Sequence, residues 1–162
     1  MANHLYYLQS VDKALSPYEI KRSTGLDPET VGVVALNSAG VYPIVDVDNP
    51  YDIRLYDVTK SYTINGTNAD ETWSKTDKDL ATAKEVAKKI VKEEAEVAAE
   101  AARGEYGAVV LIAIASKTSA QRSANETVVI DSLKTTATNL SNDIIAIDAA
   151  TDVDAIDAIV NP

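Results

Sequence analysis

Few residues in this chain are suited to catalysis. The single histidine is His4, and no motif around it supplies the partner or the pocket that a general base needs. We therefore interpret His4 as a surface or strand residue. Cysteine is absent, which excludes a thiolate nucleophile, a disulfide bond and a thiol metal site. No nucleophile elbow, phosphate-binding loop or dinucleotide fingerprint occurs, so the sequence predicts no catalytic residue and no cofactor.

Two groups of aspartates are the other candidates for chemistry. Asp46, Asp48 and Asp52 are spaced somewhat like the ligands of a calcium-binding loop. The glycine and the terminal glutamate that such a loop requires are missing, however, and Pro50 interrupts the spacing, so the segment is more typical of a turn. The three aspartates in residues 152–157 are placed to stabilise the positive N-terminal end of a short helix. We expect no metal ion at either group.

The charge balance argues against nucleic acid and membrane partners. The formal net charge is -10 with a pI of about 4.5, whereas binding a nucleic acid backbone requires clustered Lys and Arg. An anionic membrane surface is disfavoured for the same reason. The longest apolar run, Ala108–Ala115, is far shorter than the ~20 residues that span a bilayer, and residues 1–10 lack a secretory signal. We interpret this run as one or two buried helical turns, with a strand as the alternative that periodicity leaves open. We expect a soluble protein that is made in a cytoplasm.

The distribution of aromatic residues divides the chain in two. Of the eight tyrosines only Tyr106 follows position 75, and the single tryptophan is Trp73. The large side chains that fill a globular core therefore gather in the first half. The predicted fold class is α+β, with a small mixed N-terminal domain in residues 1–75 that contains a β-hairpin and two short helices. A mainly α-helical, heptad-patterned region follows in residues 76–162.

Local signals predict the elements of the first half. Ser16-Pro17 with Glu19 gives a helix start with a capping box, and Gly25 fits the end of that helix. Asp27-Pro28-Glu29 repeats the start signal at once. A short turn is expected at residues 12–13. The predicted elements are a strand over residues 5–11, helices over residues 17–24 and 28–37, and a strand over residues 41–47.

The two short helices leave a different function open. Joined by a Gly-containing turn and followed by a strand, they have the rhythm of a helix-turn-helix with a wing. Residues 28–37 would then be the recognition helix, yet they contain no Lys, Arg, Gln or aromatic residue to contact bases or phosphates. We prefer the interpretation that two helices pack on a small sheet, with a DNA-binding regulator as an alternative.

A β-hairpin is predicted around Asn65-Gly66, the favoured dipeptide of a two-residue type I′ turn with positive φ at both positions. In that register Lys60 lies opposite Glu71, and Val58 lies opposite Trp73. One face of the hairpin is then packed and the other is polar. We expect Trp73 to be buried beside Val58.

Two stretches of the second half carry apolar residues at alternating steps of three and four, the pattern of a helix seam. Glu94 interrupts the first seam, whereas the second is continuous. Such helices either fold back on each other within one chain or join copies of the chain. The first seam is rich in Ala, which buries little area, so we expect helices that need several neighbours and hence self-association, most simply as a trimer. The seam residues are Leu80, Ala83, Ala87, Ile90, Val97, Ile130, Leu133, Ala137, Leu140, Ile144 and Ile147.

Three groups of segments together carry a resemblance to a known class of proteins. They are residues 6–8 with 16–21, residues 37–52 with the Trp73 hairpin, and residues 80–84 with 152–160. Together they resemble small tail-associated proteins of tailed bacteriophages, which include fibre, baseplate and fibre-assembly proteins. Such proteins often join a compact N-terminal module to a helical segment. The resemblance implies a role in the virion or in its assembly, and it carries no catalytic residues.

These patterns favour a non-enzymatic structural component of a phage tail, in the fibre or the baseplate. Residues 1–75 are expected to attach to other tail proteins, and residues 76–162 to bind other copies of the chain. The expected location is the virion. One alternative is a cytoplasmic chaperone for tail-fibre assembly, and the other is the helix-turn-helix DNA-binding regulator.

Overall fold

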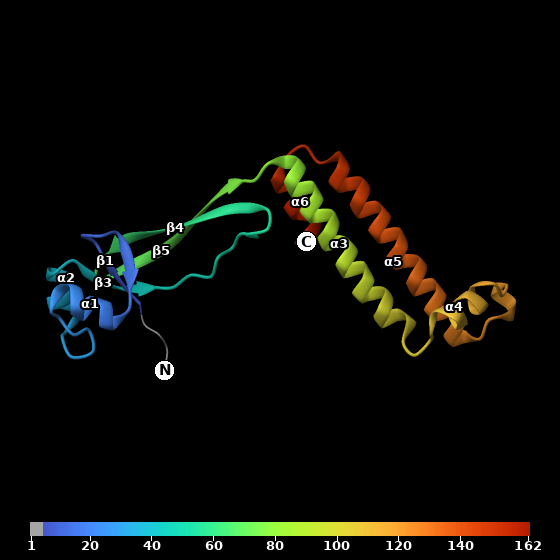
Figure 1. Ribbon diagram of the computed structural model, residues 1–162, viewed down its shortest axis with the longest axis horizontal. Helices are drawn as coiled ribbons and strands as arrows, with labels where there is room; N and C mark the ends of the chain where they lie inside the picture. Colours follow the sequence, from blue (N-terminus) through green and yellow to red (C-terminus); the bar gives the residue numbers. More distant parts are fainter. Residues whose placement is uncertain (1–4) are drawn as a thin grey trace. The chain divides into compact units, whose positions relative to one another are not determined.

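The computed structural model describes residues 5–162, so His4 lies outside the described residues. The chain divides into two compact units, Met1–Thr76 and Asp77–Pro162. The strands belong to the first unit, and the second unit is helical (Figure 1). The predicted α+β class, with a mixed N-terminal part and a mainly helical C-terminal part, is confirmed.

The first unit is built on a five-stranded sheet. Its strands are β1 (Tyr6–Leu8), β2 (Lys13–Leu15), β3 (Val41–Val45), β4 (Tyr56–Asn65) and β5 (Asn68–Asp77). The strand order is β2-β1-β3-β5-β4. β1 pairs antiparallel with β2 and β3, whereas β3 and β5 run parallel with Ile44 opposite Ala69. The sequence signals miss β2, because this three-residue strand starts within the turn expected at residues 12–13.

Two short helices, α1 (Pro17–Thr24) and α2 (Val33–Ser38), pack against the strands. Ile20 of α1 and Leu36 of α2 are buried in one cluster with Leu8 of β1 and Val41 of β3. The burial of these four aliphatic side chains, with Tyr6, Leu15, Leu26 and Val31 packed around them, stabilises this end of the sheet. Two helices packing on a small sheet is therefore the arrangement that the structure has.

The sequence predicts the first residue of α1 correctly but not that of α2. The capping box of α1 is present, because Ser16 Oγ accepts a hydrogen bond from the Glu19 N–H (3.4 Å) and the Glu19 carboxylate accepts one from the Ser16 N–H (2.8 Å). The second helix was expected from residue 28, but α2 begins only at Val33. The intervening residues form a single turn, and Gly32 then serves as an extended N-cap. Glycine disfavours a helix interior, which explains the break.

The β4–β5 hairpin forms, but its turn lies one residue further along the chain than predicted. β4 ends at Asn65 and β5 begins at Asn68, so the turn residues are Gly66 and Thr67. Gly66 has a φ of 60°, whereas neither Asn65 nor Thr67 has a positive φ. A glycine at the first of two turn positions is the pattern of a type II′ turn, so the predicted type I′ turn is wrong.

The shifted turn changes the partners across the hairpin but keeps its two faces, because β4 moves by two positions relative to β5. The Lys60 ammonium lies 4.5 Å from the centre of the Trp73 ring. It also stays in contact with Glu71, at 3.0 Å. Trp73 is half-buried and not buried as predicted, and its indole N–H donates to the backbone oxygen of Val47 (2.8 Å).

Replacing Gly66 with valine is expected to lower the free energy of unfolding of the first unit by about 1 kcal/mol or more, because a β-branched residue resists positive φ. Thr67→Ala, at the neighbouring turn position, is the matched control and should change this free energy by less than about 0.5 kcal/mol. Urea unfolding followed by the fluorescence of Trp73, the single tryptophan, measures both. Equal midpoints for the two variants would contradict the assigned turn.

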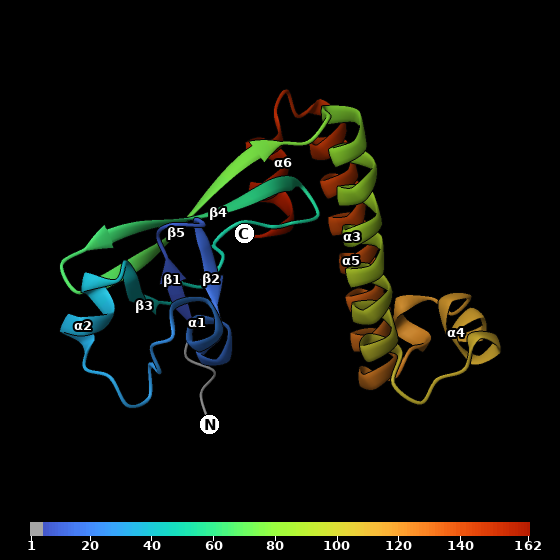
Figure 2. The same cartoon turned by 60° about the vertical axis from the view of Figure 1, so that its left-hand side comes forward.

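The second unit is a pair of long helices flanked by short ones. α3 (Leu80–Arg103) and α5 (Ala124–Ala149) run antiparallel and side by side (Figures 1 and 2). The Lys88 ammonium near the start of α3 lies 2.7 Å from the Asp148 carboxylate near the end of α5. The short helices are α4 (Ala108–Ala115), the 3-10 helix η1 (Ser119–Gln121) and α6 (Val153–Val160). Figure 2 shows α4 and α6 at opposite ends and on opposite sides of the long pair.

α6 closes the end of the pair at which α3 begins and α5 ends. Its N-cap is Asp152, whose carboxylate accepts a hydrogen bond from the Ala155 N–H (2.8 Å). The neighbouring Thr151 hydroxyl donates a hydrogen bond to the Asp152 carboxylate (3.3 Å). Aspartate at this position also interacts favourably with the positive end of the helix. The buried residues of α3, α5 and α6 at this end are Ala83, Ala87, Ile90, Val91, Ile147, Val153, Ile156 and Val160.

Candidate protein-binding surface

α4 is an apolar helix with most of its surface exposed. Its eight residues are all Ala, Val, Leu or Ile. The sequence predicts a buried segment here, but only Ile114 is buried, and Leu111 is half-buried. Val109 and Ile112 are 81% and 68% exposed. Because a helix that is apolar on every side is normally buried, the exposed side of α4 is a candidate contact surface for another protein.

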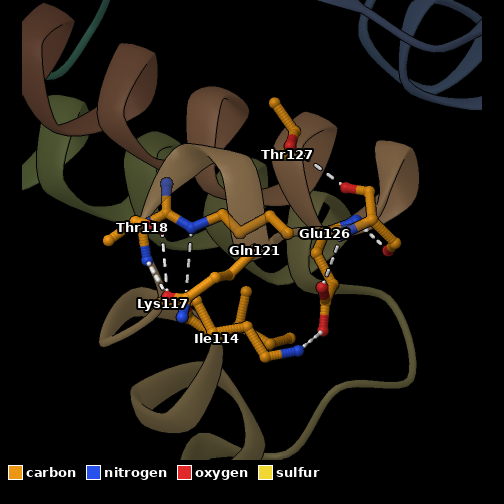
Figure 3. Close-up of polar contacts among 8 residues, drawn as sticks. Ile114, Lys117, Thr118, Gln121, Glu126 and Thr127 are labelled. Atoms are coloured by element: carbon orange, nitrogen blue, oxygen red, sulfur yellow. Dashed lines mark hydrogen bonds and ion pairs between the residues drawn. The ribbon is translucent and has the colours of Figure 1, made fainter.

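The C-terminal end of α4 is tied to the start of α5 by polar contacts (Figure 3). The Arg122 guanidinium donates to the backbone oxygens of Ile114 (3.1 Å) and Ala115 (3.0 Å). The end of a helix leaves its last carbonyl groups without intrahelical partners; here the Ile114 oxygen also accepts a hydrogen bond from the Lys117 N–H (3.1 Å). Just beyond α4, the Lys117 ammonium lies 2.6 Å from the Glu126 carboxylate in the first turn of α5. α4 is therefore held in a defined position although its side chains are exposed.

Glu126 also takes part in the cap of α5. Its carboxylate accepts a hydrogen bond from the Ser123 N–H at 2.8 Å, and Ser123 caps the helix in return. The hydrogen bond from Lys117, followed by the one from the Ser123 backbone, lowers the pKa of Glu126 below its ordinary value. These contacts therefore stabilise the folded state above the ordinary glutamate pKa, and their contribution is lost as the pH falls through the lowered value.

The middle of the long-helix pair contains no buried side chain. None of residues 92–103 of α3 or 131–146 of α5 is buried. Ala95, Thr136 and Leu140 line hollows on both sides of the pair, which marks them as the contact line, and of these three only Leu140 is a large apolar side chain. Long helices gain most of their stability from packing an apolar face. This region therefore has little packing of its own and offers two open grooves.

One groove, called here the apolar groove, lies on the α4 side of the pair. Two adjoining hollows of about 250 and 320 Å³ form it, and both are lined by Glu96, Ala99 and Leu133. It extends from Lys92 and Leu140 at one end to Leu111 of α4 at the other. Its charged lining residues have both signs: Lys92, Glu96, Glu100 and Arg103.

The other groove, called here the acidic groove, lies across the contact line. Its ionisable lining residues are Glu94, Asp131 and Asp143, and within residues 5–162 no Lys or Arg lines it. Val128 in its lining is 65% exposed. The two grooves thus differ in the sign of charge that they present to a partner.

The predicted seam residues lie in three environments. α3 and α5 pack against each other within the chain, which is the intramolecular arrangement that the sequence left open. Ile130 and Ile147 of the second seam are buried, but the positions between them are covered only in part. The buried seam residues are Ala83, Ala87, Ile90, Ile130 and Ile147; the half-buried ones are Leu80, Leu133, Leu140 and Ile144; the exposed ones are Val97 and Ala137.

On α3 the predicted seam follows the contact line only as far as Ile90. Beyond it, the buried and half-buried positions are Val91, Ala95, Ala99, Ala102 and Arg103, whereas Val97 is 71% exposed. The steps from Val91 through Ala99 are four residues each. A heptad seam requires a mean step of about 3.5, which only a left-handed supercoil maintains, so the contact line drifts away from the predicted positions.

Two of the aspartates considered for metal binding, Asp52 and Asp152, make other contacts in the structure. Asp52 forms an ion pair with Arg54 at 2.6 Å, and Asp152 caps α6. Within residues 5–162, no group of three or more His, Cys, Asp or Glu side chains is arranged to hold a metal ion. In the same part of the chain, no helix has the length and apolar character needed to cross a bilayer.

Comparisons of this chain with protein-family models, with curated proteins and with solved structures give no match. The features of the described residues that are suited to binding another protein are the α4 surface and the two grooves. Sequence reasoning missed Val109 and Ile112 as surface residues. The signal that could have found them is the uniform apolarity of residues 108–115, because no side of that helix is suited to water.

Proposed function

We propose that this chain is a non-enzymatic assembly protein of a phage tail, in the fibre or the baseplate. Its helical unit binds other protein chains, copies of itself included, and its first unit attaches to other tail proteins. The observation that carries the proposal is the exposed apolar side of α4, where Val109 and Ile112 are 81% and 68% exposed. Full burial of one such side chain contributes about 1.5–3 kcal/mol, so covering this surface with a partner is favourable.

The assignment to a phage tail is supported by the resemblance of the segments around Tyr6-Tyr7, residues 37–52 and residues 80–84 to tail-associated proteins. The division into a compact mixed unit and a helical unit agrees with the architecture that such proteins often have.

Mass spectrometry of purified phage particles tests the proposal. We expect the chain at a fixed copy number per particle. We also expect the double variant Val109→Asp/Ile112→Asp to be incorporated at least about tenfold less, equivalent to about 1.4 kcal/mol of lost contact energy. Ile145→Asp, at a residue of α5 that is 64% exposed, is the matched control and should be incorporated normally.

Two outcomes would contradict this assignment. If the chain is absent from particles but bound to a fibre protein in infected cells, it is the assembly chaperone that the sequence left as an alternative. If the chain is found in neither place, the tail role is wrong.

A further inference from the structure

We propose that α4 of one copy of this chain packs into the apolar groove of a second copy, and that two copies form a two-fold symmetric dimer in this way. The inference rests on the self-association included in the proposed function, for which it names the partner, the surface and the symmetry. A dimer of this kind differs from the trimer expected from the sequence.

The groove is long enough for one more short helix. At 1.5 Å per residue, α3 spans about 17 Å from Lys92 to Arg103, whereas the eight residues of α4 span about 12 Å. The chain's own α4 reaches only one end of the groove, through Leu111. The end between Lys92 and Leu140 is uncovered, and the small side chain of Ala137 there permits the close approach that helix packing needs.

The exposed side of α4 cannot reach the groove of its own chain. Leu111 and Ile114 are three residues apart and face the long helices, whereas Val109 and Ile112, also three residues apart, are the exposed pair. The hydrogen bonds from Arg122 to the last carbonyls of α4 fix this orientation. Val109 and Ile112 are therefore available to another molecule.

Charge favours the apolar groove as the site for a second copy. The chain carries a net charge of -10, so copies repel each other in general. The acidic groove adds to this repulsion, because its charged lining residues are all acidic. In the apolar groove the cations Lys92 and Arg103 balance the carboxylates Glu96 and Glu100, so its lining has no net charge, and α4 itself is uncharged. An acidic protein thus meets the least repulsion where an apolar helix enters this groove.

Two-fold symmetry follows from the position of α4. When two long-helix pairs meet antiparallel through their apolar grooves, each α4 covers the end of the partner's groove that is still open. The same contact is made twice, which closes the assembly. Lys92 at the open end can then meet Glu105, which precedes α4 of the other copy; neither residue has an ion-pair partner within residues 5–162.

Disulfide trapping tests the contact directly, because the chain has no cysteine of its own. Purified full-length Ile112→Cys is mixed with Ala137→Cys under mild oxidation, and a covalent dimer of the two variants is expected. In the matched control, Asn139→Cys takes the place of Ala137→Cys. Asn139 is exposed on the same helix, but it lines the acidic groove. Little cross-linking is expected there. Equal or stronger trapping by Asn139→Cys would overturn the proposal.

Light scattering on the purified protein provides the second measurement. At about 10 µM, a dimer with a Kd of about 1 µM is mostly associated, so we expect a mass close to twice the chain mass of 17.3 kDa. Ile112→Asp should give the monomer mass with an unchanged far-UV CD spectrum. Val128→Asp, at a similarly exposed valine of the acidic groove, should stay dimeric.

A monomeric wild type would overturn the inference and would leave a helix of another tail protein as the occupant of the groove. An oligomer that Ile112→Asp does not change would overturn it too, because the copies would then meet elsewhere. Neither result removes the proposed tail role, which the particle composition tests separately.

Discussion

Replacing Ile147 with alanine is expected to destabilise the helical unit by about 2–5 kcal/mol while leaving the first unit unchanged. Ile147 is fully buried at the end of the long-helix pair, where α3, α5 and α6 come together. Truncation there removes apolar contacts and leaves a cavity. The middle of the pair, which has no buried residue, cannot compensate for that loss.

Two optical signals separate the units in this experiment. The far-UV CD signal comes mainly from the helices of the second unit, whereas Trp73 lies in the first. With Ile147→Ala, the urea midpoint from CD should fall and the midpoint from Trp73 fluorescence should stay. Ile145→Ala, at an exposed residue two positions away on the same helix, is the control and should cost less than about 0.5 kcal/mol. If both midpoints fall together, the two units do not unfold independently.

The parts of the fold that the sequence predicts well depend on short-range chemistry. The capping box of α1 needs only Ser16 and Glu19, three residues apart, because both hydrogen bonds lie within one turn. The stop at Gly25 is similar: its φ of 77° is a conformation that glycine adopts without steric cost. Signals of this kind identify a helix end whatever the rest of the chain does.

The hairpin turn illustrates a weaker signal. Asn65-Gly66 and Gly66-Thr67 are both acceptable two-residue turns, of type I′ and II′ respectively. A change from one to the other slides the strands by two positions, so the same side chains stay on each face. The hydrophobic pattern of the hairpin is therefore equally satisfied by both registers. Longer-range packing, including the contact between the Trp73 indole and the backbone of Val47, accompanies the register that the chain adopts.

Burial in the helical unit was the least predictable feature. The apolar run of α4 and the second seam both predict buried side chains, but burial also needs a neighbour. Only one side of α4 has one, and the middle of α5 faces the small residues of α3. A sequence pattern reports which side chains avoid water. It does not report whether the covering surface belongs to the same chain, which is why the apolar groove emerged only from the structure.

The second large effect is expected in the first unit, at the ion pair between Lys60 and Glu71. The Glu71 carboxylate is nearly inaccessible, with only 3% of its side chain exposed, and it lies 3.0 Å from the Lys60 ammonium. Burial alone disfavours the charged form of Lys60, but the hydrogen bond to Glu71 and nearby negative charges outweigh it and raise the pKa of Lys60. The stabilisation from a raised lysine pKa is present below the ordinary value of 10.5 and is lost as the pH rises through the folded-state value. It is therefore complete at neutral pH.

Lys60→Met should lower the free energy of unfolding of the first unit by about 2 kcal/mol, because it leaves the buried Glu71 carboxylate without its cation. Breaking a fully buried pair costs about 3–5 kcal/mol; the smaller value applies because 36% of the Lys60 side chain is exposed. The double variant Lys60→Met/Glu71→Leu should recover most of the loss, since an apolar pair of similar volume needs no counter-charge.

Lys21→Met, which breaks the exposed pair with Asp27 in the same unit, is the control and should cost less than about 1 kcal/mol. Urea unfolding followed by Trp73 fluorescence compares the variants. If Lys60→Met costs no more than Lys21→Met, the buried carboxylate does not depend on this cation, and the hairpin is stabilised by its apolar and aromatic contacts instead.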